Sequence, residues 1–232
     1  MAALTTSRIE ELILYSNHLT DSSCPHLASG IRNNQTLRTL NLSKNNLEGP
    51  HFTDLMAALT TSRIEELQLY SNYLADSSCF HLASGIRNNQ TLRILNLSNN
   101  SLEGPHFRDL MAALTTSRIE ELHLNNNHLT DSSCPHLASG IRNNQTLRIL
   151  NLSENNLEGP HFSDLMTALT TSRIEELQLD KNCLTDSSCP HLTSGIRNNQ
   201  TLKRLNLSWN KLEGPHFSDL MEALMISQIE EL

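Results

Sequence analysis

The sequence SRIEELQLYSNYL occupies residues 62–74, and close copies of it begin at Ser7, Ser117 and Ser172. A shorter form, SQIEEL, begins at Ser227. The copies recur at intervals of 55 residues, so four full units and the start of a fifth fill the chain. A period in this range is typical of a solenoid, in which each unit packs only against its neighbours.

Each unit contains two halves with one skeleton, Leu-x-x-Leu-x-Leu-x-x-Asn-x-Leu. In the first unit the halves start at Ile9 and Leu37, and the starts then alternate by 28 and 27 residues to give eight full repeats. The later starts are Ile64, Leu92, Ile119, Leu147, Ile174 and Leu202. The whole chain resembles the leucine-rich repeat family. We therefore expect residues 1–232 to form a single array.

The apolar spacing changes within each repeat. Alternating leucines before the asparagine predict a short strand with one buried face, and the following apolar residues fall at helical spacing. Residues 24–31 are expected to form a helix with Asp21 as N-cap, and 52–59 a helix with Pro50 in its first turn. The predicted fold is an α/β solenoid, a horseshoe with a parallel sheet on the concave face and helices on the convex face.

Composition narrows the class of protein. The chain has 232 residues, a net charge of −8 and only 4% aromatic residues. No apolar run is long enough to span a membrane, and the N-terminus lacks the regions of a signal peptide. Four of the five cysteines share one apolar helix position, typical of small core residues rather than disulfides. These features predict a cytoplasmic protein without membrane contact.

Motifs that could carry chemistry repeat identically and are better explained as scaffold. Cys24 and His26 recur in every unit, but their copies lie too far apart to share a zinc ion. The pair Glu10 and Glu11 faces Arg38 of the next strand, which favours a cross-strand charge ladder over a catalytic carboxylate pair. We predict no enzymatic activity, no metal and no cofactor.

The asparagine of each skeleton is predicted to be structural. It stands at Asn45 and Asn72 and in every other repeat, where a buried amide can bond turn backbone of its own and neighbouring repeats.

The units differ mainly at strand and turn positions that should face the concave surface. We predict ligand binding by Ile13, Tyr15, Lys44, Gln68, Tyr70, Tyr73, His123, Asn125, Asn126, Glu154, Gln178, Asp180, Lys181, Arg204, Trp209 and Lys211. Neutral drift is the alternative. It should also alter helix positions without a packing role, for which we take Ser22, Ser23, Asn33 and Asn34, yet these recur unchanged. Selection on one surface explains both observations.

The aromatic residues favour a protein ligand. All three tyrosines and the only tryptophan occupy the variable positions, and these residue types anchor protein interfaces. Four of the five phenylalanines instead belong to the repeated core position of Phe52. A basic C-terminal end, with Lys181, Arg204 and Lys211, raises the alternative of a nucleic acid. The acidic chain without a continuous basic stripe argues against it.

The alternating repeats resemble the ribonuclease-inhibitor-like subclass found in NOD-like receptors. The resemblance rests on LTDSSCPHLASGI at residues 19–31 and QTLRILNLSENNL at residues 145–157. In that family such arrays sense ligands or hold an ATP-driven module inactive. The resemblance therefore implies the ligand-sensing part of an innate immune receptor. An enzyme inhibitor of the ribonuclease-inhibitor type and an extracellular leucine-rich-repeat receptor remain alternatives.

Both ends of the chain interrupt the pattern. Residues 1–8 repeat residues 56–63, and the sequence stops at Leu232 within a strand motif. Solenoids usually need polar caps at their ends. We expect a fragment of a longer array without caps, which associates end to end when alone.

Overall fold

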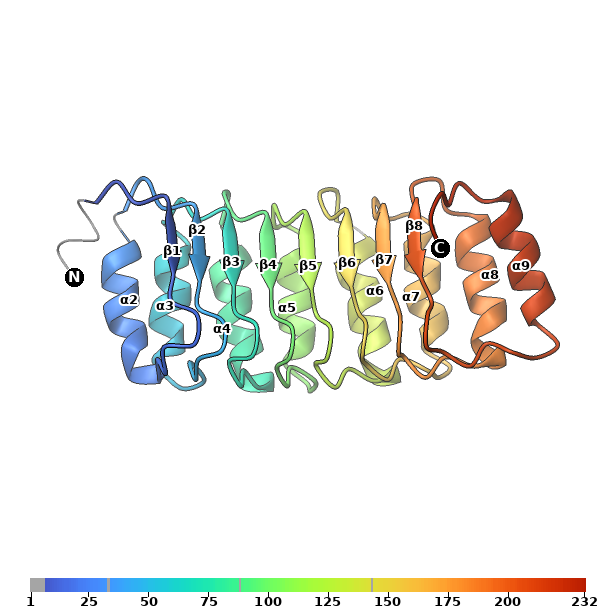
Figure 1. Cartoon of the computed structure of the whole chain (residues 1–232), viewed down its shortest axis with the longest axis horizontal. Helices are drawn as coiled ribbons and strands as arrows, with labels where there is room; N and C mark the ends of the chain where they lie inside the picture. The colour runs from blue at the N-terminus through green and yellow to red at the C-terminus, as the bar shows by residue number, and fades with distance from the viewer. Residues whose placement is uncertain (1–6, 33, 88, 143) are drawn as a thin grey trace.

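The computed structural model describes residues 7–32, 34–87, 89–142 and 144–232. Strands and helices alternate along the chain, with one strand and one helix in each repeat (Figure 1). The strands are β1 (Glu11–Ile13), β2 (Thr39–Asn41), β3 (Glu66–Gln68), β4 (Ile94–Asn96), β5 (Glu121–His123), β6 (Ile149–Asn151), β7 (Glu176–Gln178) and β8 (Arg204–Asn206). The helices are α2 (Cys24–Ile31), α3 (Phe52–Leu59), α4 (Asp76–Arg87), α5 (Phe107–Leu114), α6 (Cys134–Arg142), α7 (Phe162–Leu169), α8 (Cys189–Arg197) and α9 (Phe217–Ile226). Short 3-10 turns, η1 (Asp21–Ser23), η2 (Asp131–Ser133) and η3 (Asp186–Ser188), precede three of the helices.

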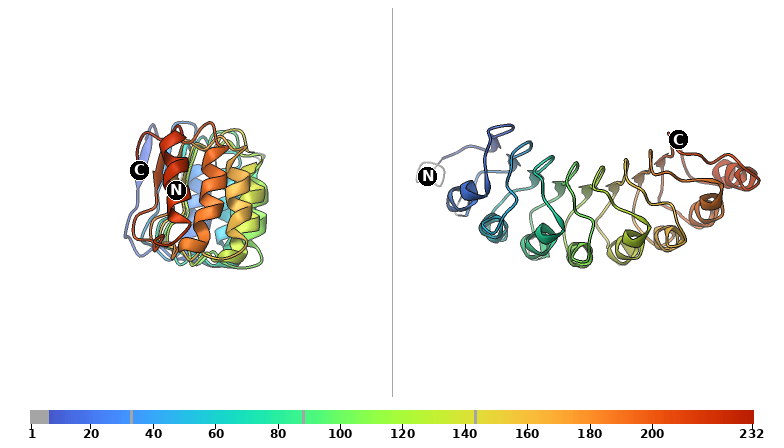
Figure 2. Two further views of the ribbon diagram at one scale, coloured as in Figure 1. Left: turned by 90° about the vertical axis from the view of Figure 1, so that its right-hand side faces the viewer. Right: turned by 90° about the horizontal axis from the view of Figure 1, so that it is seen from below.

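The strands form one parallel sheet in the order β1 to β8, as the sequence predicts. Pairing is in register throughout, so that Leu67 faces Leu40 on one side and Leu95 on the other. Figure 2 shows the sheet on the inner, concave side of a gentle arc and the helices on the outer side. The predicted α/β solenoid is confirmed.

The core lies between the two layers. The central leucine of each strand turns inward and packs against the apolar stripe of the helices. The cysteines at the repeated helix position are buried, as predicted, and burial is the main cause that raises the pKa of the Cys24 thiol to about 12. Phe52 and its copies in α5 and α7 are fully buried. Phe217 departs from the prediction, since 39% of it is exposed on α9.

The helices span the predicted residues, Cys24–Ile31 and Phe52–Leu59, but the two predicted capping positions are wrong. Thr20, not Asp21, stands at the N-cap of the first 3-10 turn, and α3 begins at Phe52 after Pro50. In later units the aspartate reaches the next half of the unit instead. Asp131 accepts a hydrogen bond of 2.8 Å from the backbone N–H of His161. The aspartate therefore ties two half-repeats together rather than capping its own helix.

The asparagine of the skeleton has the predicted structural role. Asn100 donates to the carbonyls of Leu69 and Leu97 and accepts from the backbone N–H groups of Asn72 and Leu74. The same bonds recur at Asn45 and Asn155 and join each turn to the preceding repeat. In the alternate repeats Asn72, Asn127 and Asn182 donate to the preceding repeat, but their Oδ1 atoms are buried without a hydrogen-bond partner among the described residues. None of the helices in the described residues is both long and apolar enough to cross a bilayer.

Candidate ligand-binding surface

The in-register pairing arranges the outward side chains of the strands in rows across the concave surface. The glutamate row consists of Glu11, Thr39, Glu66, Ile94, Glu121, Ile149, Glu176 and Arg204. The amide row consists of Ile13, Asn41, Gln68, Asn96, His123, Asn151, Gln178 and Asn206. Beyond the strands follow the tyrosine row, Tyr15, Ser43, Tyr70, Ser98, Asn125, Ser153, Asp180 and Ser208, and the turn row, Ser16, Lys44, Ser71, Asn99, Asn126, Glu154, Lys181 and Trp209.

The predicted ligand-binding residues all lie outside the core, half-buried or exposed. Most belong to these rows, while Tyr73 and Lys211 stand in the loops that follow. The exposed fraction reaches 57% for Ile13, 72% for Tyr73 and 82% for Trp209. The predicted placement is thus confirmed, and the binding role of these residues stays a prediction.

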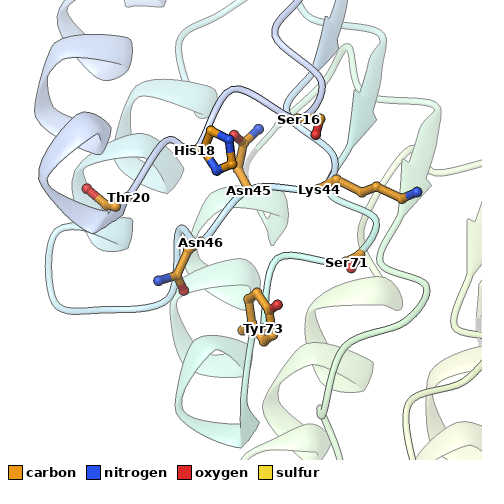
Figure 3. Close-up of a pocket in the computed structure, with 8 residues that line it drawn as sticks. All are labelled: Ser16, His18, Thr20, Lys44, Asn45, Asn46, Ser71 and Tyr73. Atoms are coloured by element: carbon orange, nitrogen blue, oxygen red, sulfur yellow. The ribbon is translucent and has the colours of Figure 1, made fainter.

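An aromatic and cationic cluster marks the N-terminal half of the surface. The Nζ atom of Lys44 lies 5.4 Å from the ring centroid of Tyr15 and 5.8 Å from that of Tyr70. A hydrogen bond with Tyr15 is the main cause that raises the pKa of the Lys44 ammonium. Beside the cluster a hollow of about 650 Å³ is lined by Lys44, His18 and Tyr73 among others (Figure 3). Two predicted tyrosines thus flank the predicted Lys44, and a fourth predicted residue, Tyr73, lines the hollow beside it.

The C-terminal half carries charges that are already paired. Lys181 bonds Glu154 at 2.8 Å, and Arg204 bonds Glu176. Asp180 accepts a hydrogen bond of 3.0 Å from Asn206. Because two of its three basic residues face carboxylates, this end is not the free basic patch that the sequence suggests. Trp209 projects beside it as an exposed aromatic side chain.

The turn row has an unusual backbone. Its non-glycine residues adopt positive φ angles, 53° at Lys44 and 59° at Trp209, and the loop residue Tyr73 has 60°. This left-handed region is costly for most side chains, by roughly 1–2 kcal/mol per residue, and asparagine tolerates it best after glycine. Asn99 and Asn126 satisfy that preference. Lysine and tryptophan at equivalent positions do not, so local stability does not account for them, and such outliers favour a functional role.

The positions chosen to test drift prove to be structural. Asn89, the copy of Asn34, is buried, and its side chain bonds the backbone of Leu59 and Leu92. Ser78, the copy of Ser23, is buried and donates to Glu48. Ser22 is exposed, but its copy Ser77 also donates to Glu48, and Asn33 lies outside the described residues. Our prediction that these positions lack a packing role is wrong, because their partners come from the preceding repeat.

Helix positions outside the core behave in two ways. At one of them the serine is exposed in all four units and recurs unchanged, as Ser29, Ser84, Ser139 and Ser194. The concave surface varies while this exposed serine does not. Other helix positions outside the core do vary, for example Thr53, Arg108, Ser163 and Ser218, so variation is not confined to the concave surface.

The paired glutamates divide between two surfaces. In the second, third and fourth pairs the first glutamate forms the expected ladder, for example Glu120 with Arg93 and Glu175 with Lys203 at 3.0 Å. The second belongs to the glutamate row and bonds concave side chains instead. His123 and Gln178 contact Glu121 and Glu176 at 2.7 Å and 3.0 Å. Assigning both glutamates to the ladder was wrong. Adjacent residues of a strand point to opposite sides, so the two glutamates of a pair meet different neighbours.

Four further concave residues, which do not vary between units, were not predicted from the sequence. Asn41, Asn96, Asn151 and Asn206 stand in the amide row of every second strand. The sequence does indicate this placement. Each of these asparagines lies two residues before the Ser of an LNLS segment, and alternate strand residues share a face. Among the described residues, no cluster of three or more histidine, cysteine or carboxylate side chains could hold a metal ion.

Comparison with known proteins agrees with this architecture. Leucine-rich repeat family models match residues 33–50, 143–160 and 198–215, and also 91–112 and 118–139. The chain is 33% identical over 221 residues to the human NACHT, LRR and PYD domains-containing protein 13, covering 93% of this chain and 21% of that protein. Mouse ribonuclease inhibitor is 31% identical over 226 residues, covering 95% of this chain and 50% of the inhibitor.

The fold is shared more widely. The tropomodulin C-terminal domain of Caenorhabditis elegans matches with a TM-score of 0.52 and 22% identity, covering 65% of this chain and 91% of that domain. The chain belongs to the leucine-rich repeat proteins, and its repeats are of the ribonuclease-inhibitor-like kind found in NACHT, LRR and PYD domains-containing proteins. It spans between about a fifth and a half of the length of the relatives named above.

Proposed function

We propose that this array is a non-enzymatic recognition module that binds a protein ligand, or another segment of its own receptor, on the concave surface. In this proposal it is the ligand-sensing part of a NOD-like innate immune receptor in the cytoplasm. The observation that carries it is the gathering of variable, exposed and locally strained residues on one face. Tyr70 and Trp209 lie on that face, and aromatic side chains anchor interfaces at a small entropic cost.

The experiment is affinity capture from host cytosol with three forms of the array. One is unchanged, one carries Tyr15→Ala, Tyr70→Ala and Trp209→Ala, and one carries Phe80→Ala. Phe80 is the matched control, because it is an aromatic residue on α4 with 59% of its surface exposed. We expect a partner that the unchanged array and the control retain and that the triple variant loses. Equal capture by all three forms, once circular dichroism shows equal folding, would contradict concave recognition.

A second function is favoured by one feature, the glutamate row. Its carboxylates, with the net charge of −8, would suit a basic protein. The array would then act like the ribonuclease inhibitor relative, by covering a basic enzyme. Calorimetric titration with pancreatic ribonuclease would test this, and Glu121→Gln with Glu176→Gln should weaken any 1:1 binding. Absence of binding at the highest usable concentration would exclude this ribonuclease as the partner.

We also propose end-to-end association of isolated arrays. Met225 and Ile226 on α9 are 83% and 74% exposed, and Ile9 at the other end is 42% exposed. Exposed apolar patches of this kind favour association. Light scattering should show a mass that rises with concentration. Met225→Thr with Ile226→Thr, which restores the residues of the other units, should lower it, and a monodisperse unchanged array would contradict the proposal.

A further inference from the structure

The invariant asparagines of the amide row hold a donor group ready on the concave surface. The Oδ1 atoms of Asn41 and Asn96 each accept a hydrogen bond of 3.0 Å from the backbone N–H two residues later. A backbone N–H bonds an acceptor, so the side-chain oxygen and not the side-chain nitrogen must face it. This fixes the orientation of the amide. In the described part of the chain, the Nδ2 groups of Asn41, Asn96 and Asn151 donate to no other residue, and all three side chains are half-buried.

The spacing of these donors selects the conformation of a ligand. Asn41 and Asn96 lie in one row on alternate strands, β2 and β4, which are about 9.4–9.8 Å apart at the usual strand separation. In a polyproline II helix, the same face returns every three residues, after about 9.3 Å. In a β-strand, the third residue lies about 10 Å along but points to the opposite side. A ligand that crosses the strands and meets both donors therefore fits polyproline II and not β geometry.

The two neighbouring rows supply walls with the same spacing. Tyr15 and Tyr70 follow β1 and β3 on one side, and aromatic side chains are the usual platform for polyproline II segments. On the other side stand Glu11 and Glu66, which have no ion-pair partner among residues 7–32, 34–87, 89–142 and 144–232. Lys44 lies between the two tyrosine rings. The lysine repels positive charge from the tyrosine side, whereas the glutamates attract it on theirs.

We propose that strands β1 to β4 bind a polyproline II segment of the protein ligand, rich in proline and with basic residues at every third position. Carbonyl groups of the segment accept hydrogen bonds from Asn41 and Asn96, prolines pack on Tyr15 and Tyr70, and the basic side chains pair with the glutamate row. This rests on the proposed function, since it names the chemistry of the ligand at the N-terminal half of the same concave surface.

The first experiment selects binders from random displayed peptides of about twelve residues, long enough for four turns of polyproline II. The unchanged array should enrich peptides with proline and with arginine or lysine spaced by three. Enrichment of peptides without proline, or with no preferred spacing of basic residues, would overturn the inference. A failure to enrich any peptide would overturn it as well, because the site would then not bind a linear segment.

The second experiment measures an enriched, fluorescein-labelled peptide by anisotropy against variants. Asn41→Ser and Asn96→Ser each remove the Nδ2 donor but keep a side-chain oxygen for the backbone N–H, and the shorter hydroxyl does not reach the position of Nδ2. Each should weaken binding by about tenfold, as expected for one lost hydrogen bond. Asn151→Ser is the matched control, with the same bond at 2.9 Å but outside β1 to β4, and should leave binding within about twofold. Equal effects of all three variants would overturn the assignment.

The two proposals can fail separately. If cytosolic capture depends on Tyr15, Tyr70 and Trp209 but no proline-rich peptide is selected, concave recognition stands and the ligand chemistry proposed for β1 to β4 is wrong. If capture is also insensitive to these residues, the proposed function fails with it.

Discussion

Adjacent residues of one turn behave in opposite ways. Asn45, Asn100, Asn155 and Asn210 are identical in every unit, whereas the residues directly before them are Lys44, Asn99, Glu154 and Trp209. The asparagines are bonded to the backbone of two repeats, and the preceding side chains point to solvent from a left-handed backbone. The comparison teaches that bonding between repeats fixes the first set, while the second set is free to be chosen for another purpose.

The largest expected effect concerns the buried asparagine. Asn100→Ala should lower the free energy of unfolding by about 3 kcal/mol, because it leaves buried backbone groups of two repeats without partners. Urea unfolding measures the change. The control is Asn99→Lys, which copies Lys44 into the second unit and should cost no more than about 1 kcal/mol. Equal costs at the two positions would remove the distinction between them.

A glycine of the scaffold should have a slightly smaller effect. Gly104 has a φ of 151°, and a Cβ there would lie 2.4 Å from Cγ of Asp76. Gly104→Ala should therefore cost about 2–3 kcal/mol in unfolding free energy, through backbone strain and a displaced carboxylate. Thermal and urea unfolding would both report it. A cost below about 0.5 kcal/mol would show that the contact of Asp76 with the following half-repeat contributes little to the free energy of unfolding.

Replacing the exposed tryptophan should change the free energy of unfolding in the opposite direction. Trp209→Asn relieves the left-handed strain and should raise the free energy of unfolding by up to about 1 kcal/mol, while it weakens ligand capture. Unfolding and capture are measured on the same preparation. A loss of stability of 1 kcal/mol or more would instead mean that Trp209 is part of the scaffold.

The smallest effect concerns pH and the aspartate–histidine contacts between half-repeats. A hydrogen bond with Asp131 is the main cause that raises the pKa of His161 above 6.5. The contact therefore stabilises the folded state fully below pH 6.5, and this stabilisation is lost as pH rises through the pKa of His161 in the folded state. Burial raises the pKa of Asp186, but bonds from His216 outweigh it and hold the pKa below 3.8. Its stabilisation is complete above pH 3.8 and is lost as pH falls through the folded value.

The urea midpoint should therefore be highest between these two limits. His161→Gln should flatten the decline on the alkaline side and leave the acid side unchanged. If the variant kept the full alkaline decline, the His161 contact would not be its source.

The sequence predicted the parts of the molecule that depend on local periodicity. Strands, helices, sheet order and the outward side chains of the strands follow from the alternation of apolar residues. The bond between Asn17 and Asn45 and the ladder formed by Arg38 were predicted too, because their partners stand at equivalent positions of adjacent repeats.

Contacts between different positions of two repeats could not be predicted in this way. Ser78 meets Glu48 and Asp131 meets His161, each across 30 residues, and neither partner belongs to the other's pattern. These contacts depend on how far one turn is displaced along the next, which the period does not encode. For the same reason the sequence did not show that Lys44 lies between two tyrosines.

The most direct test of concave recognition is photo-crosslinking in host cytosol, with benzoylphenylalanine in place of Tyr70 or, as the matched convex position, of Phe80. Both side chains are aromatic, and they lie on opposite layers of the solenoid. We predict a discrete crosslinked protein with the photoreactive group at Tyr70 and none, or only a diffuse background, at Phe80. A discrete product at Phe80 alone would place the ligand on the helices and contradict the account.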